Sequence, residues 1–157
     1  MRVHRINFTG AILERGFWLY AWRITNAKRI IYYVGRTGDS SSKYAASPFS
    51  RLGQHLDVRP SASANMLLRQ VRKLGIDPLI CTYELVAFGP IFPEQENLEL
   101  HRHYRDRIAP LEAALANMLK ERGLEVVGKH GSKGIAEPGL LKQIKKAFDA
   151  EFTKRPR

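Results

Sequence analysis

Two stretches rich in aromatic and β-branched residues decide the fold: residues 17–24 (FWLYAWRI) and residues 29–35 (RIIYYVG). Side chains of this kind pack well on a pleated surface and favour strands. The polar segment 25–28 (TNAK) separates the two stretches. Because a short polar link between two strands is typical of a hairpin, we expect the stretches to pair antiparallel.

The rest of the chain alternates helical patterns with one further strand. The elements expected after the hairpin are, in chain order, a loop over residues 36–49, a helix over at least 51–56, a helix over 63–74, a strand over 79–88, a helix from 93 to about 107, a helical segment from 110 to 122, and a helix from 138 to about 152. Pro110 either opens a helix of its own or kinks a continuous one, and Glu112 then falls in the first turn of such a helix. The pattern predicts an α+β fold, in which a small three-stranded antiparallel sheet is flanked by helices.

The charge of the chain points to a polyanionic partner. Lys and Arg number 26 against 15 Asp and Glu, which gives a net charge of +11. Net charge selects partners rather than folds, and a surface this basic attracts DNA, RNA, anionic membranes or acidic proteins. With 44% hydrophobic residues the chain can bury a core, yet it lacks the run of roughly 18 apolar residues that a membrane helix needs. We therefore expect a soluble protein without membrane insertion.

Cysteine content and short motifs narrow the chemistry. Cys81 is the single cysteine, so no internal disulfide can form, and no apolar run of signal-peptide length follows the start. Both features favour a cytoplasmic, intracellular protein. The sequence has no Walker-type glycine loop, no paired CxxC and no HExxH, which leaves zinc-thiolate and cysteine-nucleophile chemistry without support.

The chain divides by character into residues 1–125 and a basic extension over 126–157. From residue 129 onward eight Lys or Arg face three acids, a net charge of 8 − 3 = +5. Gly131 and Gly134 lie among these basic residues and suit a close approach to a phosphate backbone, although a solvated helix face explains the charge equally well. The basic residues expected to contact DNA are Arg36, Lys43, Lys129, Lys133, Lys142, Lys145 and Lys146.

Five further residues are candidates for chemistry. They are Tyr20, Tyr33, Arg51, His55 and Glu112. Arg51 and His55 are four residues apart and so share one face of a helix. The Arg51 guanidinium can bind two phosphate oxygens at once, as Lys cannot. One carboxylate, completed by water and phosphate oxygens, can hold a hard cation such as Mg²⁺.

The order and spacing of these residues resemble the GIY-YIG nucleases over roughly residues 16–125. Residues 18–20 (WLY) stand where that family has Gly-Ile-Tyr, and residues 33–35 (YVG) where it has Tyr-Ile-Gly. The segment 50–56 (SRLGQHL) is similar to the helix that carries the family's essential Arg. The segment 109–115 (APLEAAL) is similar to the one that bears its metal-binding Glu.

The resemblance implies a metal-dependent endonuclease that hydrolyses DNA phosphodiester bonds with Mg²⁺ or Mn²⁺. It implies Tyr20 as the general base for an attacking water, Tyr33 beside it, and Arg51 on the phosphate. Glu112 would bind the metal, with Glu94, Glu96 and Glu99 as alternatives. His55 competes with Tyr20 as the base, because an imidazole titrates near neutral pH whereas a phenol titrates near 10.

Two departures from the family pattern support a second hypothesis. Trp18 replaces the first glycine of the motif, and no Asn aligns clearly after Glu112. A non-catalytic nucleic-acid-binding module with the same fold would tolerate both changes, and a basic surface for an acidic protein is a third interpretation. If the protein cuts duplex DNA on both strands, it acts either as a homodimer or by sequential nicking. Its preference for single- or double-stranded DNA stays open, since phosphate contacts carry no base information.

Overall fold

The predicted hairpin is confirmed and forms the centre of the sheet. The structure is a computed structural model that describes residues 3–152. Strand β1 (Gly16–Thr25) pairs antiparallel with strand β2 (Ile30–Arg36), so that Tyr20 lies opposite Gly35 and Trp22 opposite Tyr33. Both pairs therefore present their side chains to the same face of the sheet.

The sheet has four strands rather than the expected three, and it is mixed rather than wholly antiparallel. Strand β3 (Thr82–Pro93) pairs antiparallel with β1, and the two-residue strand β4 (Val126–Val127) pairs parallel with β2, giving the order β3-β1-β2-β4. A strand of two residues is too short to leave an alternating pattern, which is why the sequence did not predict it. The α+β class is confirmed.

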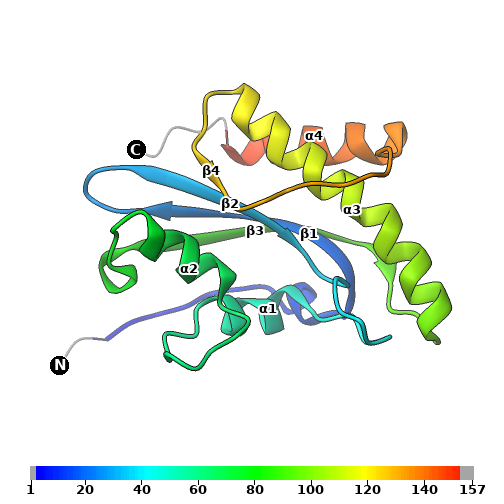
Figure 1. Ribbon diagram of the computed structural model, residues 1–157, viewed down its shortest axis with the longest axis horizontal. Coiled ribbons are helices and arrows are strands. Elements are labelled where there is room, and N and C mark those ends of the chain that lie inside the picture. The colour runs from blue at the N-terminus through cyan, green and yellow to red at the C-terminus, as the bar shows by residue number, and fades with distance from the viewer. Residues whose placement is uncertain (1–2, 153–157) are drawn as a thin grey trace.

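Helices cover both faces of this sheet in three layers (Figure 1). They are α1 (Pro48–His55), α2 (Met66–Lys73), α3 (Leu98–Glu121) and α4 (Pro138–Phe152). Helices α3 and α4 lie above the strands in Figure 1, whereas α1 and α2 lie below them. None of the helices within residues 3–152 is long and apolar enough to cross a membrane.

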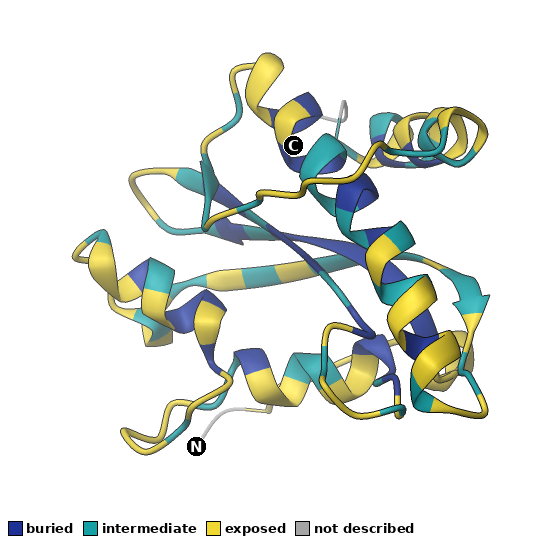
Figure 2. Ribbon diagram, turned by 45° about the vertical axis from the view of Figure 1, so that its right-hand side comes forward, coloured by how far each residue is buried: buried dark blue, intermediate teal, exposed yellow. Residues whose placement is uncertain are grey.

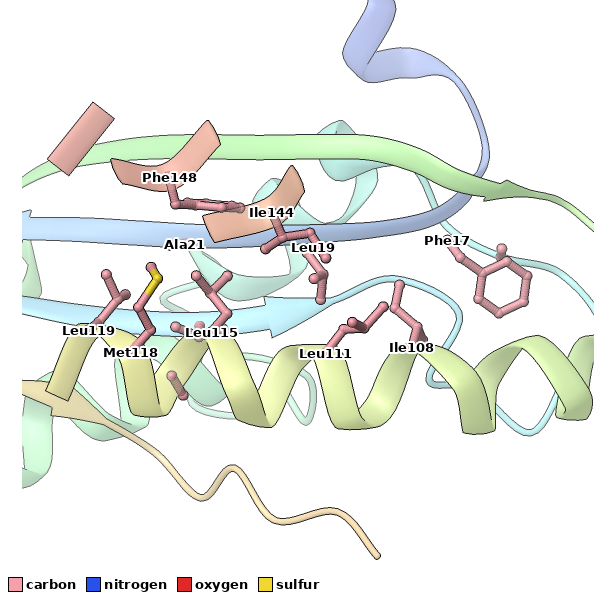
Figure 3. Packing of buried hydrophobic residues seen from close by; sticks show 13 residues of the cluster. Phe17, Leu19, Ala21, Ile108, Leu111, Leu115, Met118, Leu119, Ile144 and Phe148 are labelled. Atoms are coloured by element: carbon pink, nitrogen blue, oxygen red, sulfur yellow. The ribbon is translucent and has the colours of Figure 1, made fainter. Parts of the chain in front are cut away.

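The larger core lies between the sheet and helices α3 and α4. Leu19 and Ala21 of β1 meet Leu111 and Leu115 of α3 there, and Figure 3 shows the α3 side chains directed at the strands. Ile144 and Phe148 of α4 are fully buried in the same cluster. Burial of each large apolar side chain contributes roughly 1.5–3 kcal/mol. The basic C-terminal helix is thus packed onto the body of the fold, while its other face stays exposed (Figure 2).

The smaller core lies on the opposite face, under α1 and α2. Alternation along β1 turns Tyr20, Trp22 and Ile24 to this side, where they meet Leu67 and Leu68 of α2. The two faces of β1 thus contribute to two separate cores. The face toward α1 and α2 carries the candidate phenols.

The predicted start of α3 at residue 93 is wrong. Strand β3 continues to Pro93, where the Phe92 ring packs 6.4 Å from that of Phe17. The helix begins at Leu98, because the Asn97 side chain caps it by accepting a hydrogen bond from the Leu100 N–H at 2.9 Å.

From there α3 runs without a break through Pro110 to Glu121. Of the two arrangements predicted at Pro110, the structure shows the continuous helix. Glu112 therefore lies in the middle of a helix and not in a first turn. The helix dipole does not account for its presence there.

Three other boundaries move slightly. Helix α2 begins at Met66 rather than at residue 63. Helix α1 begins at Pro48, earlier than expected, because the Ser47 hydroxyl accepts a hydrogen bond from the Ser50 N–H at 3.2 Å. Strand β3 begins at Thr82, because residues Pro78–Ile80 form a short 3-10 helix. None of these shifts changes which face the candidate residues occupy.

Candidate active site

Tyr20 and His55 form the centre of the candidate site. The Tyr20 hydroxyl lies 2.7 Å from His55 Nε2, and both side chains are buried. Gly35, opposite Tyr20 on β2, makes this placement possible. A Cβ atom at Gly35 would lie 2.5 Å from Cε2 of the Tyr20 ring. The glycine of the YVG segment therefore leaves room for the phenol across β2.

Helix α1 supplies both His55 and Arg51. Their four-residue spacing places them on one face, as the sequence predicts, and the Arg51 guanidinium interacts electrostatically with the Tyr20 hydroxyl. Arg51 also forms an ion pair with Asp39 and donates a hydrogen bond to Gln54 Oε1 at 2.9 Å. Its Nε is buried without a hydrogen-bond partner among the described residues. One N–H group of the guanidinium is thus left unsatisfied inside the described part of the protein.

Tyr33 lies beside this pair. Its ring centroid is 5.3 Å from that of His55, with the rings in an edge-to-face arrangement. Burial, and then the negative charge of Glu112, raise the pKa of Tyr33 to about 12. Burial also raises the pKa of Tyr20, against the opposing effect of Arg51. Both phenols are therefore protonated at neutral pH.

His55 is neutral at the same pH. Burial, together with the positive charge of Arg51, lowers the pKa of His55 to about 4. Its Nδ1 has no hydrogen-bond partner within the described chain. In the tautomer that carries the proton on Nδ1, Nε2 accepts the hydrogen bond from Tyr20 and can receive its proton.

Glu112 belongs to α3, which lies across the sheet from α1 (Figure 1). Strand β4 covers β2 only at Tyr32 and Tyr33, so the β2 edge beyond them carries no further strand. Glu112 lies at that edge, with Oε2 3.5 Å from Arg36 Nε. Burial raises the pKa of Glu112 to about 7, although Arg36 opposes the shift. The positive charge of Arg36 thus offsets only part of the cost of burying the Glu112 carboxylate.

Glu112 and Asp39 are the carboxylates near the phenols, and Asp39 is already paired with Arg51. A buried carboxylate with a raised pKa gains from a bound cation, which makes Glu112 the residue able to hold one. No cluster of three or more His, Cys, Asp or Glu side chains suited to a metal occurs in residues 3–152. A Mg²⁺ ion would take its remaining ligands from water and phosphate.

The competing acid Glu94 has a different role. Both of its oxygens accept hydrogen bonds from the Arg15 guanidinium, each at 2.8 Å, and Oε1 also accepts one from the Ala45 N–H at 3.0 Å. Glu94 thus ties the start of β1 to the loop before α1. Among the acids that the sequence left open, Glu112 is the one whose charge reaches both phenols.

A cavity of about 430 Å³ opens next to Glu112. Tyr33 and Glu112 line one part of it, and Lys129 and His130 of the loop between β4 and α4 line another. His130 Nε2 donates a hydrogen bond to the Val34 carbonyl at 3.0 Å, which fixes the ring against the β2 edge. The candidate site therefore continues into a space of ligand size.

The basic residues predicted to contact DNA do not share one surface. Arg36 lies in the site and Lys129 in the cavity, whereas Lys133 is exposed on the same loop and Lys43 donates to the Glu96 carbonyl at 3.2 Å. The three remaining lysines line a separate hollow of about 450 Å³ on α4: Lys142, Lys145 and Lys146. Helix α4 lies across the sheet from α1, so these lysines are remote from the phenols (Figure 1).

Trp18 does not disturb the site, although it replaces a glycine of the family motif. Its backbone N–H donates to Thr37 Oγ1 at 2.8 Å and its indole N–H to the Glu14 carbonyl at 3.0 Å. The ring packs on Gly89, where a Cβ atom would lie 2.9 Å from the indole. Tyr20 keeps its position opposite Gly35.

Asp39 was not predicted as a site residue. It lies in an irregular loop, 12 residues before Arg51, and no periodic pattern links such positions. The one usable signal is the preceding Gly38, whose φ of +76° marks a turn that returns the chain toward α1.

The chain was compared with models of protein families, with curated proteins and with solved structures, and no match was found in any of the three.

Proposed function

We propose that this chain is a metal-dependent endonuclease that hydrolyses DNA phosphodiester bonds, in the manner of the GIY-YIG nucleases that its motifs resemble. The observation that carries the proposal is the 2.7 Å contact between Tyr20 and His55, with the charges of Arg51 and Glu112 acting on the same phenol. Hydrolysis needs a base for water, a cation for the phosphate and help for the leaving oxygen. These side chains supply groups for each task.

Arg51 is proposed to bind the scissile phosphate. Its buried Nε is free of partners among the described residues, and its pairing with Asp39 fixes the guanidinium beside Tyr20. Arg36 has Nε and Nη1 likewise without hydrogen-bond partners there, and it is the second candidate for a phosphate oxygen. Charged donors held in place before the reaction are worth more than mobile ones.

Tyr20 and His55 are proposed to act together as the base. The phenol oxygen takes a proton from the attacking water while the phenol passes its own proton to His55 Nε2. This relay avoids a free phenolate, which the raised pKa of Tyr20 disfavours. It also gives both candidates for the base a role.

Glu112 is proposed to hold the divalent cation. A bound Mg²⁺ or Mn²⁺ would neutralise charge on the phosphate and on the leaving oxygen. The raised pKa of Glu112 means that its carboxylate form, which binds a cation, predominates only above about pH 7.

We also propose a cytoplasmic location. The free thiol of Cys81 supports it, because thiols stay reduced in that compartment.

The test is cleavage by the purified protein of supercoiled plasmid and of single-stranded DNA, with Mg²⁺, with Mn²⁺ and with EDTA. The proposal predicts nicked or linear products only with a divalent cation. Absence of products from both substrates with either metal would refute it. The ratio of nicked to linear plasmid reports whether strands are cut one at a time.

A non-catalytic nucleic-acid-binding module is the second candidate. Asp39 pairs with Arg51, and Glu112 lies 3.5 Å from Arg36, so that both arginines of the site already have an acid of the chain beside them. This alternative predicts DNA binding that weakens with salt and needs no metal, without any product after long incubation.

A further inference from the structure

Most of the residues that line the cavity next to Glu112 have no part in the motifs or in the proposed mechanism. Its volume of about 430 Å³ falls within the range of roughly 300–1,000 Å³ that small-ligand sites occupy. Water needs about 30 Å³, so the space is far larger than a solvent site. Helices α2 and α3, strand β2 and the loop after β4 line it together.

Two lysines line this cavity from separate elements. Lys73 ends α2, and Lys129 follows β4. Both are exposed, and neither forms an ion pair within the described chain. Glu112 is the acid in the lining, and its nearest cation is Arg36. Two unpaired ammonium groups at the mouth of one cavity favour an anionic group there.

The other walls suit a base and a sugar. Tyr33 and Met66 present apolar surface, and the Gln70 amide adds a donor and an acceptor. Because a carbonyl only accepts, the hydrogen bond to Val34 places the His130 proton on Nε2. Nδ1 of the neutral ring is then an acceptor, without a partner among residues 3–152. Free phosphate would use the lysines alone, whereas a nucleotide would use every wall.

We propose that this cavity binds one nucleotide unit of the substrate strand, with its phosphate at Lys73 and Lys129 and its base against Tyr33, Met66 and Gln70. The cavity shares Tyr33 and Glu112 with the candidate active site, so the bound unit is the neighbour of the scissile phosphate. That adjacency rests on the proposed nuclease function. Nucleotide binding in the cavity does not depend on it.

The test uses the full chain without metal, so that no cleavage is involved. Thymidine 5′-monophosphate, thymidine and inorganic phosphate are each titrated, and NMR shifts are followed at the backbone amides and at the Met66 methyl. We expect the nucleotide to shift Met66, Lys129 and His130, and to bind at least about fivefold more tightly than phosphate or thymidine. Lys73→Ala and Lys129→Ala should each weaken nucleotide binding by roughly 5- to 10-fold, which corresponds to about 1–1.4 kcal/mol.

Lys28→Ala is the matched control, because Lys28 is an exposed lysine in the turn between β1 and β2 and does not line the cavity. It should leave nucleotide binding unchanged. Phosphate binding as tight as the nucleotide, shifts confined to α4, or no shift at millimolar nucleotide would each overturn the proposal. Nucleotide binding in a protein that cuts no DNA would refute the nuclease alone, and cleavage without nucleotide binding would refute the cavity alone.

Discussion

The Tyr20 hydroxyl and His55 Nε2 lie 2.7 Å apart although 35 residues separate them in the chain. One residue belongs to the central strand β1, and the other ends α1. Burial raises the pKa of the phenol and lowers the pKa of the imidazole to about 4, so both groups are neutral. A neutral phenol that contacts a neutral imidazole forms a hydrogen bond rather than an ion pair.

Tyr20→Phe should lower the cleavage rate by roughly 10²–10⁴-fold, the usual contribution of a general base. The ring and its packing remain, so the fold should persist. Tyr32→Phe is the control. It lies on the neighbouring strand, and its ring faces Phe152 on the other side of the sheet, with centroids 5.4 Å apart. The measurement is the rate of plasmid nicking with Mg²⁺ for each variant. An equal decrease in this rate in Tyr20→Phe and Tyr32→Phe would contradict the role of Tyr20.

Gly35→Ala should damage both stability and cleavage. The new Cβ would lie 2.5 Å from the Tyr20 ring, which must move away from His55. Overpacking of this kind costs roughly 1–3 kcal/mol in the free energy of unfolding. Gly53→Ala is the control, because nothing lies within 4 Å of a Cβ there and the site is inside α1. It should stabilise by about 0.5–1 kcal/mol. Urea unfolding measures both, and a neutral Gly35→Ala would show that the ring is not held by this contact.

Glu112→Gln should abolish metal-dependent cleavage and leave DNA affinity largely intact, because the amide keeps the shape but loses the charge that holds a cation. Glu99→Gln, in the first turn of the same helix and exposed, should cut normally. Cleavage and fluorescence-anisotropy binding are measured on the same preparations. An active Glu112→Gln variant would remove this residue from the mechanism.

The same substitution should change stability in a direction set by pH. Burial raises the pKa of Glu112 from its ordinary 4.5 to about 7 in the folded protein. Its contribution to stability is therefore full below pH 4.5 and is lost as the pH rises through 7. Glu112→Gln removes that loss and should be more stable than the wild type at pH 8, by roughly 1–3 kcal/mol, but not at pH 4.5. Urea midpoints at the two pH values test this, and a variant less stable at pH 8 would contradict the buried, uncompensated carboxylate.

Much of the fold could be predicted because its centre is encoded locally. Most residues of the aromatic stretches that became β1 and β2 favour strands, and the spacing of Arg51 and His55 fixes their common face. Strand β4 could not be predicted, since Val126–Val127 gains its state only from pairing with β2. The start of α3 could not be predicted for a related reason. The Glu94 side chain accepts a hydrogen bond from Arg15, which is distant in sequence, and does not lie in the first turn of the helix.

The candidate site divides in the same way. The convergence of Tyr20, Tyr33 and His55 follows from hairpin register and helix spacing, both of which leave a pattern in the sequence. The contributions of Asp39 and His130 depend on the path of irregular loops, which no spacing encodes. Loop residues that complete a site are visible only once the chain has folded.

The most direct test of the central claim is a double-mutant cycle on the cleavage rate. Single-turnover rates with Mg²⁺ are measured for the wild type, Tyr20→Phe, His55→Asn and the double variant. If the two residues relay one proton, the double variant should be no slower than the slower single variant, because residues that act as a unit lose their function once. Independent losses that multiply, or a wild-type protein with no metal-dependent cleavage to lose, would contradict the account.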